Sequence, residues 1–355
     1  MNDFFHSRVR PFSVDSPMTA AQLLDAMGGT AFQARNVAQA ARIWSRMLED
    51  DAVIMFGLAG ALVPAGMRRV IVYLIENRLI DVLVSTGANL FHDVYETLGK
   101  FHFQGSPESD DHELGRRRIN RFYDVLAPES DFSAAEEFIT QLSYTLDRTH
   151  PYTTREYFRT VGEALMPVAE EEGILTAAAR HGVPVYSPAL GDSVHGLAIA
   201  FGRARSDTAG PQQAPPVLFD VIGDVLETAH IAATAPATGV IYVGGGTPKN
   251  FIQQAEVGGY IFQRELPGHK YAVQITMDQP QWGGLSGCTF EEAQSWRKIA
   301  PDATMVTVNV EATVALPLIV SALAEGSADV IKKRRPPAIS FDGMPGAWRR
   351  DGGSS

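Results

Sequence analysis

The stretch Val240-Ile241-Tyr242-Val243-Gly244-Gly245-Gly246-Thr247 decides the fold, because it joins an uninterrupted apolar run to a triple-glycine turn. A continuous apolar strand is typical of a parallel sheet whose two faces are both covered. A glycine turn after such a strand lets backbone N–H groups approach a phosphate. A glycine triplet alone is more often a plain turn. The stretch therefore predicts a buried parallel strand, and it marks the turn as a candidate nucleotide site.

Outward from this stretch, short apolar runs alternate with helical patterns along the chain. Strands are predicted at residues 53–56, 80–84, 183–186, 240–243, 271–275 and 305–308. Helices are predicted at residues 67–75, 90–98, 157–180, 217–232, 290–299 and 311–324. This alternation predicts an α/β fold, with a Rossmann-like parallel sheet flanked by helices. The G-x-G-x-x-G fingerprint of ordinary Rossmann domains is absent from the sequence.

The same pattern predicts how the chain is divided. The parts are an irregular N-terminal arm at residues 1–17, one large domain at residues 18–331, and a peripheral or disordered tail at residues 332–355. Within the domain, residues 100–130 are expected to leave the sheet as an excursion, and residues 205–216 to form a surface loop. The basic quartet Lys332-Lys333-Arg334-Arg335 is interpreted as the solvated end of the last helix.

The composition is that of an acidic globular protein. The chain has 355 residues, of which 45% are hydrophobic and 20% charged, and its formal net charge is −11. Nucleic acid is not expected as the main ligand, because phosphate binding needs a basic surface. No apolar run reaches the ~20 residues that span a bilayer, and no signal peptide is seen, so no membrane association is expected.

The single cysteine, Cys288, excludes an internal disulfide and fits a cytoplasmic location. It is interpreted as a small packing residue. No cluster of histidines and cysteines has the spacing of metal ligands, so no metal site is expected.

Candidate chemistry lies in segments that follow predicted strands, where ligands bind in parallel α/β sheets. These segments cover residues 84–89, 187–193, 244–250 and 309–313, and all are rich in small or polar residues. A second candidate is Lys298, which follows Trp296 and two glutamates. A desolvated lysine amine can lose its proton and attack a carbon electrophile. Lysine is more often a solvated surface residue, so Lys298 alone does not decide between the two interpretations.

The order and spacing of several blocks resemble the deoxyhypusine synthase family, which includes homospermidine synthases and bacterial homologues of unsettled substrate. The resemblance runs from about residue 30 to about residue 320. The blocks that carry it are residues 30–36, 80–86, 187–190, 244–246, 292–298, 311–312 and 317–320. Residues 18–331 are accordingly expected to be a deoxyhypusine synthase-like catalytic domain.

The resemblance implies a chemistry and a site. In that family NAD removes a hydride from spermidine, and a 4-aminobutylidene group is held as an imine on a lysine. Lys298 falls on that lysine, Trp296 on a tryptophan packed along the amine, and Glu292 on an amine-binding carboxylate. The predicted cofactor site combines matched and adjacent positions: Ser85, Thr86, Gly87, Asp192, Gly244, Gly245, Gly246, Glu311 and Ala312.

The chain also departs from the family pattern. Two aspartates that hold amine ends appear here as Leu197 and Leu285. A cofactor-side aspartate appears as Trp282, and the histidine after the glycine turn as Asn250, which we keep as a predicted substrate contact. A glutamate near the nicotinamide appears as His92. A buried ammonium without a carboxylate is costly, so these changes are expected to alter which amine fits.

His92 is predicted as a second catalytic residue, and it is followed by Asp93. Two interpretations stay open. His92 is either a general base that a neighbouring carboxylate orients, or one of a pair of residues at a helix start with no catalytic role.

The sequence thus predicts an NAD-dependent aminoalkyl transferase that acts on a small polyamine. The resemblance implies a homotetramer with active sites between subunits. One alternative is homospermidine synthesis from putrescine, and another is a non-catalytic protein that binds NAD or a polyamine. A protein lysine as acceptor is possible but is not favoured.

Overall fold

A six-stranded parallel sheet organises the computed structural model, which describes residues 7–14, 16–50, 52–207 and 216–346. The strand order is β6-β2-β1-β7-β8-β9, and every neighbouring pair is parallel. The strands are β1 (Val53–Leu58), β2 (Val82–Ser85), β6 (Val185–Tyr186), β7 (Thr238–Val243), β8 (His269–Ile275) and β9 (Ile299–Val308). The predicted α/β fold is confirmed.

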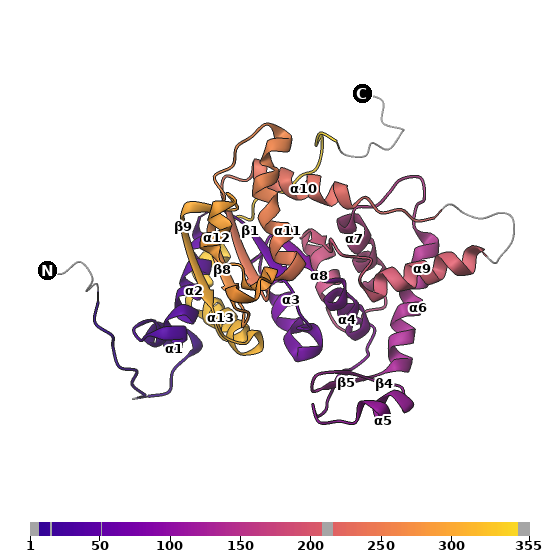
Figure 1. Cartoon of the computed structure of the whole chain (residues 1–355), viewed down its shortest axis with the longest axis horizontal. Helices are drawn as coiled ribbons and strands as arrows, with labels where there is room; N and C mark the ends of the chain where they lie inside the picture. The colour runs from indigo at the N-terminus through magenta and orange to yellow at the C-terminus, as the bar shows by residue number, and fades with distance from the viewer. Residues whose placement is uncertain (1–6, 15, 51, 208–215, 347–355) are drawn as a thin grey trace.

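Helices cover both faces of this sheet (Figure 1), because successive side chains of each strand point to opposite faces. On one face the strands pack against α2 (Phe32–Glu49), α3 (Arg68–Glu76) and α13 (Ala312–Gly326). On the other face they pack against α10 (Val221–Thr234), α11 (Gly246–Val257) and α12 (Phe290–Ser295). A short helix, α1 (Ala20–Gly28), packs on α2 and α13. It begins with a capping box between Thr19 and Gln22.

A second group of helices continues from the β6 side of the sheet. They are α4 (Gly87–Thr97), α6 (Glu129–Thr145), α7 (Thr154–Leu165), α8 (Ile174–His181) and α9 (Val194–Asp207). Between α4 and α6 the chain forms a small antiparallel sheet with strand order β3-β5-β4 and one short helix. Its elements are β3 (Phe103–Gln104), α5 (Asp111–Arg116), β4 (Ile119–Phe122) and β5 (Val125–Pro128). This hairpin module projects from the body (Figure 1), which confirms the predicted excursion at residues 100–130.

Two predicted helices were wrong in extent. The helix expected over residues 157–180 is two helices, α7 and α8, because Pro167 and Gly173 interrupt the pattern. The helix expected over residues 290–299 ends at Ser295, and Arg297 adopts the left-handed conformation with φ of 58°. Trp296 and Lys298 therefore lie in a turn that leads into β9 rather than on a helix.

The start of the predicted tail packs more closely than expected. After α14 (Ala328–Lys333), the guanidinium of Arg334 forms an ion pair of 2.6 Å with Asp81, and the two side chains are 3% and 0% exposed. The side chain of Arg334 is therefore buried against Asp81, which precedes β2, in contrast to the expected solvated quartet. The other three residues of the quartet, Lys332, Lys333 and Arg335, are exposed as predicted. Farther on, Phe341 lies 4.3 Å beneath the guanidinium of Arg155. The division at residues 17 and 331 stays a prediction.

Some sequence predictions fall on residues without a described structure. Residues 208–215 of the expected loop lie outside the described residues, as do residues 347–355 of the tail. The part of the expected loop that precedes them belongs to α9, which extends to Asp207.

The strand order reverses between β1 and β7. From this pair the chain builds the sheet outward to β6 on one side and to β9 on the other. Such a reversal separates the connections at the carboxyl ends of the two strands and leaves a crevice in which ligands bind. The glycine turn that follows β7 lies at this point.

Candidate active site

The triple-glycine turn occupies the reversal point of the sheet. Gly244 and Gly246 adopt φ values of 75° and 54°, in the left-handed region that glycine enters most readily. A Cβ on Gly244 would lie 3.3 Å from Ala59 in the loop after β1. A Cβ on Gly246 would meet only Pro248, at 4.0 Å, and one on Gly60 would meet nothing within 4 Å. Backbone at these open positions suits the close approach of a phosphate, so the crevice fits a dinucleotide.

Gly245 serves a different purpose. A Cβ there would lie 2.4 Å from the Cα of Ser286, so the missing side chain makes room for a loop of the same chain. The hydroxyl of Ser286 accepts the N–H of Gly246 at 3.0 Å. The amide of Gln274 donates to the carbonyl oxygens of Gly244 and Ser286, both at 2.8 Å. The glycine turn is thus fastened to the loop that carries Leu285 and Cys288.

The other predicted cofactor residues end neighbouring strands at the same edge. Ser85 is buried, and its hydroxyl donates to the carbonyl of Leu58. Thr86 caps α4 and accepts the N–H of Asn89. Gly87 allows a close contact, because a Cβ there would lie 2.4 Å from Ser193, the neighbour of the exposed Asp192.

Glu311 and Ala312 follow β9, which is the last strand at the end of the sheet opposite β6. Glu311 caps α13 by accepting the N–H of Thr313 at 2.9 Å. The edge therefore gathers all the predicted cofactor residues, in two groups on either side of the glycine turn.

Lys298 points into a cavity of about 320 Å³ on the α11 side of the sheet. Its Nζ donates to the Oδ1 of Asn250 at 2.9 Å and lies 5.5 Å from the ring centroid of Trp296. We call this cavity the lysine pocket. Its lining includes Lys249, Asn250, Gln253, Leu285, Cys288, Glu292, Trp296 and Lys298. The structure thus brings together the predicted Lys298, Trp296, Glu292 and Asn250.

Sequence reasoning missed Lys249, a second lysine in the same pocket. Lys249 is 1% exposed, and its Nζ donates to the carbonyl of Cys288 and, at 2.8 Å, to the Oε1 of Gln274. Burial lowers the pKa of Lys249 to about 8. The signal was present, since Lys249 lies three residues before the buried Ile252 and so shares its helix face.

Gln253 is a second missed residue, on the same face of α11. It is 2% exposed, and its Nε2 is enclosed without a hydrogen-bond partner among the residues that the structure describes. The side chain also lines the lysine pocket.

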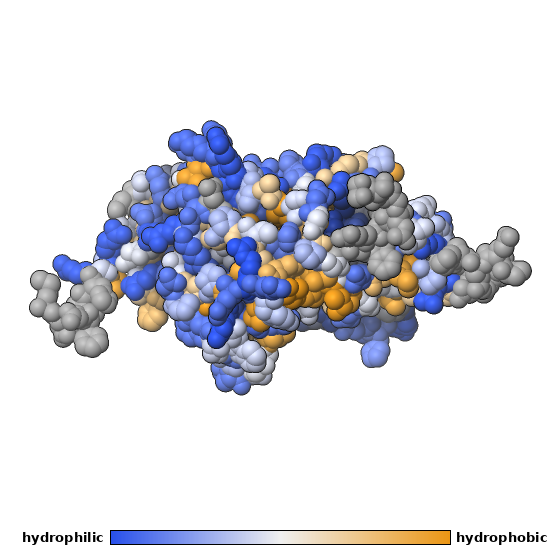
Figure 2. Space-filling model, turned by 90° about the horizontal axis from the view of Figure 1, so that it is seen from above, coloured by the Kyte–Doolittle hydropathy of each residue, from blue (hydrophilic) through white to orange (hydrophobic). Residues whose placement is uncertain are grey.

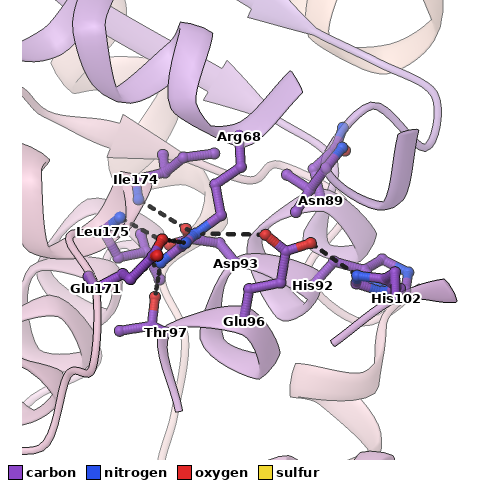
Figure 3. Close-up of polar contacts among 12 residues, drawn as sticks. Arg68, Asn89, His92, Asp93, Glu96, Thr97, His102, Glu171, Ile174 and Leu175 are labelled. Atoms are coloured by element: carbon purple, nitrogen blue, oxygen red, sulfur yellow. Dashed lines mark hydrogen bonds and ion pairs between the residues drawn. The ribbon is translucent and has the colours of Figure 1, made fainter. Parts of the chain in front are cut away.

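His92 lies elsewhere, in a compact group of polar residues on α3, on α4 and at the start of the hairpin module (Figure 3). We call Arg68, His92, Asp93, Glu96 and His102 the histidine cluster. The Nδ1 of His92 lies 3.0 Å from the Nε2 of His102, and the Nδ1 of His102 lies 2.7 Å from the Oε1 of Glu96. Burial, with a smaller contribution from His102, lowers the pKa of His92 to about 3. His92 is thus held neutral.

The neighbouring carboxylate that we considered as a partner for His92 has another role. Asp93 is fully enclosed and accepts the N–H groups of Ile174 and Leu175 at 2.7 and 2.9 Å, at the start of α8. It also pairs with the Nε of Arg68 at 3.0 Å. Asp93 therefore ties α8 to α4, and Glu96 reaches His92 through His102 instead.

Two departures from the family pattern are exposed to solvent. Leu197 on α9 is 63% exposed, and Trp282 is 66% exposed. Neither Leu197 nor Trp282 is among the residues that line the lysine pocket.

Neither a membrane span nor a metal site emerges from the described part of the chain. None of its helices combines the length and the apolar character needed to cross a bilayer. Its His, Cys, Asp and Glu side chains form no group of three or more that is arranged to hold a metal ion.

Comparison with known proteins identifies the family. The family model for deoxyhypusine synthase matches residues 22–323. A relative named "Probable deoxyhypusine synthase 2" from Methanosarcina mazei is 44% identical, over 97% of this chain and 97% of its own length. A protein of the same name from Archaeoglobus fulgidus is 45% identical, over 87% of this chain and 98% of its own.

The fold agrees with a solved structure. A solved structure named "Crystal Structure of a putative deoxyhypusine synthase from Entamoeba histolytica" superposes with a TM-score of 0.60 over 88% of this chain and 96% of its own, and it is 20% identical. At that identity the likeness concerns the fold alone. Together with the sequence matches, it confirms the resemblance seen in the sequence: the chain belongs to the deoxyhypusine synthase family, whose members are transferases.

Proposed function

We propose that the protein is an NAD-dependent aminoalkyl transferase of polyamine metabolism that carries a 4-aminobutyl group on Lys298. The observation that carries the proposal is the setting of that lysine. Its Nζ lies in a cavity, fixed by one amide oxygen of Asn250 and placed over the ring of Trp296. A lysine held in this way is oriented for attack on a carbon electrophile.

In this proposal Lys298 reacts in its neutral form. The Nζ attacks the imine carbon of an oxidised spermidine, a C=N bond to Lys298 forms, and 1,3-diaminopropane leaves. Lys249 lies in the same pocket, where burial lowers its pKa to about 8. Trp296 offers an aromatic face to the amine chain, and Glu292 supplies a carboxylate at the rim.

NAD, when bound, supplies the hydride acceptor for the amine and the hydride donor for the final imine. The open backbone at Gly60 and Gly246 would receive its phosphates, and Thr86, Gly87, Asp192, Glu311 and Ala312 would line the rest of the cofactor site. The support for this assignment is the position of these residues at the reversal point and along the carboxyl edge of the sheet.

We infer that a second copy of the chain completes the active site, within the homotetramer that the family resemblance implies. The rim of the lysine pocket is apolar and open, with Leu285 48% and Trp296 65% exposed. Apolar surface is also visible in the middle of the face drawn in Figure 2, bordered by hydrophilic surface. Exposed apolar areas of this kind mark interaction surfaces.

The acceptor that we favour is a free amine. Leu285 stands in the lysine pocket where the family pattern has an aspartate, so a highly charged amine finds fewer counter-ions there. Homospermidine synthesis, with putrescine as acceptor or donor, is the second candidate, and the same leucine favours it. A translation-factor lysine as acceptor is not favoured. We expect the reaction to take place in the cytoplasm.

The test is incubation of the purified protein with NAD and a panel of polyamines, followed by mass analysis of the products. A new amine product that requires NAD, formed with spermidine or putrescine, supports the proposal. Binding of NAD and amines without any product would favour the non-catalytic alternative. Efficient labelling of a translation-factor precursor would show that the acceptor is a protein.

A further inference from the structure

The hairpin module places a second histidine directly on His92. His102 lies at the start of the module, just before β3, while His92 and Glu96 lie one turn apart on α4. Figure 3 shows Glu96 between the Arg68 guanidinium on one side and the two histidines on the other. The three groups form a chain of two short contacts, 3.0 Å from His92 to His102 and 2.7 Å from His102 to Glu96.

This chain of contacts restricts where each proton lies. The Glu96 carboxylate, which lies 3.8 Å from the Nε of Arg68, can only accept, so the Nδ1 of His102 carries the proton that it donates. When the Nε2 of His102 carries no proton, it accepts from the Nδ1 of His92, and the lone pair of His92 is left on its Nε2.

The surroundings keep His92 neutral and leave that lone pair free. The ring of His92 packs edge-on against Phe122 of β4 at 4.8 Å and Phe132 of α6 at 5.5 Å. It is 4% exposed. Its Nε2 has no partner within the described part of the chain, and it is not among the unpaired polar atoms that are sealed from solvent there. The small open part of His92 therefore includes Nε2.

His92 lies on the helix that begins at the candidate cofactor edge. His92 lies six residues, or roughly 9 Å along the axis, from Thr86, which caps the same helix at the carboxyl end of β2. Between them Asn89 accepts the N–H groups of Leu62 and Val63 at 3.0 and 3.2 Å, which fixes α4 against the loop after β1. The helix that carries His92 is thus rigidly placed.

We propose that His102 and Glu96 are positioning residues, which hold His92 as a neutral imidazole with an unprotonated Nε2, and that this nitrogen accepts a hydrogen bond from an N–H of the amine substrate. The ligand class rests on the proposed function, because that function supplies the amine. His92 is then a hydrogen-bond acceptor and not a general base, since a ring kept neutral by its surroundings is a poor proton acceptor. The hairpin module has the role of delivering His102 and Phe122 to the ring.

The positioning part can be tested on the ligand-free protein by nitrogen NMR of ¹⁵N-histidine-labelled samples. The signals of His92 are assigned by their loss in His92→Phe. The unaltered protein should show His92 with a protonated Nδ1 and an unprotonated Nε2. His102→Phe keeps a ring that packs on Tyr95 and Phe122 but removes the nitrogen that accepts from His92. His92 should therefore shift to the Nε2–H form, which the neutral histidine side chain favours in water.

Two further variants guard against a merely structural effect. Glu96→Ala should give the same shift in His92 by releasing His102, even if His102→Phe fails to fold. Phe122→Leu is the matched control, because it removes a ring that touches His92 and leaves both hydrogen bonds in place; it should keep the native tautomer. An unchanged His92 tautomer in a folded His102→Phe or Glu96→Ala variant overturns the proposal.

The ligand part is tested by calorimetric titration with spermidine in the absence of NAD, so that no turnover occurs. His102→Phe should weaken spermidine binding by about 10-fold or more, because a hydrogen bond from a charged donor is lost. Phe122→Leu should bind within about threefold of the native protein. Equal spermidine affinity in the native protein and in a His102→Phe variant with a shifted tautomer contradicts the proposal. Failure of the proposed function would appear separately, as absence of any NAD-dependent product from a protein with the native tautomer.

Discussion

The lysine pocket and the histidine cluster are built in opposite ways. The pocket is open, with Trp296 65% and Leu285 48% exposed at its rim. The cluster is closed, with His92 4% exposed and Asp93 fully enclosed. In the pocket a hydrogen bond to Asn250 holds the amine of Lys298, whereas in the cluster the polar groups hold one another.

Under the proposed function, the difference indicates which of the two regions is self-contained. Closed polar groups are costly to leave unpaired, so the cluster has to be finished within the chain that carries it. An open apolar rim, in contrast, leaves apolar surface that a second protein chain can bury. We therefore expect substitutions in the pocket to affect chemistry, and substitutions in the cluster to affect stability and amine binding.

The largest effect is expected at Lys298. Lys298→Ala should reduce transfer to the background rate, because no other group occupies its place over Trp296, while NAD affinity and thermal unfolding stay close to native. The matched control is Lys270→Ala, at an exposed lysine paired with Asp50 on the surface, which should retain activity. Steady-state product formation measures both. Normal turnover by Lys298→Ala would show that Lys298 does not carry the chemistry.

The next effect concerns the closed cluster. Arg68→Leu leaves the enclosed Asp93 without its counter-ion and should lower the free energy of unfolding by about 3–5 kcal/mol. Arg121→Leu breaks an ion pair with Asp111 on the surface of the hairpin module and should lower the free energy of unfolding far less, because exposed ion pairs contribute little to stability. Urea unfolding compares the two. If both variants lost the same free energy of unfolding, the enclosed Asp93 would not depend on Arg68 as its counter-ion.

A smaller effect follows from the neutral His92. Its pKa of about 3 in the folded protein lies below the unfolded value of 6.5, so below pH 6.5 the unfolded chain binds a proton that the native state does not. Stability should fall as the pH falls from 6.5 toward 3, and His92 should account for about 2 kcal/mol between pH 7 and pH 5. Between pH 7 and pH 5, His92→Phe should therefore lose about 2 kcal/mol less stability than the native protein. Phe122→Leu, which removes no titrating group, should keep the native slope.

The smallest effect is one of specificity at the open rim. Leu285→Asp places a carboxylate in the lysine pocket and should raise kcat/KM for spermidine relative to putrescine by about fivefold, since a partly exposed ion pair contributes about 1 kcal/mol. Leu285→Asn has nearly the same shape without the charge and should leave the ratio unchanged. A similar ratio in the native protein and both variants would show that the leucine does not select the amine.

The sequence predicted the parts of the molecule that depend on local pattern. Continuous apolar runs identified the strands, and small or polar residues after them marked the carboxyl edge where Thr86, Asp192, Gly244 and Glu311 lie. The family resemblance added the grouping of Lys298, Trp296 and Glu292, which the lysine pocket contains. These features follow from the order of elements along the chain.

What the sequence did not reveal depends on contacts between distant segments. Arg334 neutralises Asp81 across 253 positions, so a basic tail was interpreted as solvated. His102 reaches His92 only because the hairpin module folds back on α4, and Asp93 is used by the start of α8 instead. Gly245 was expected to face a phosphate, but the space beside it is filled by Ser286, which no local pattern indicates.

The central claim is that Lys298, and not its neighbour Lys249, carries the substrate carbon. The direct measurement is to incubate the native protein with NAD and spermidine, reduce with borohydride, digest, and locate the adduct by peptide mass spectrometry. Our account predicts a 4-aminobutyl adduct on Lys298, with Lys249 unmodified, because the Nζ of Lys298 lies over the ring of Trp296 while the amine of Lys249 is bonded to Gln274 and the carbonyl of Cys288. An adduct on Lys249, or no NAD-dependent adduct on either lysine, would contradict it.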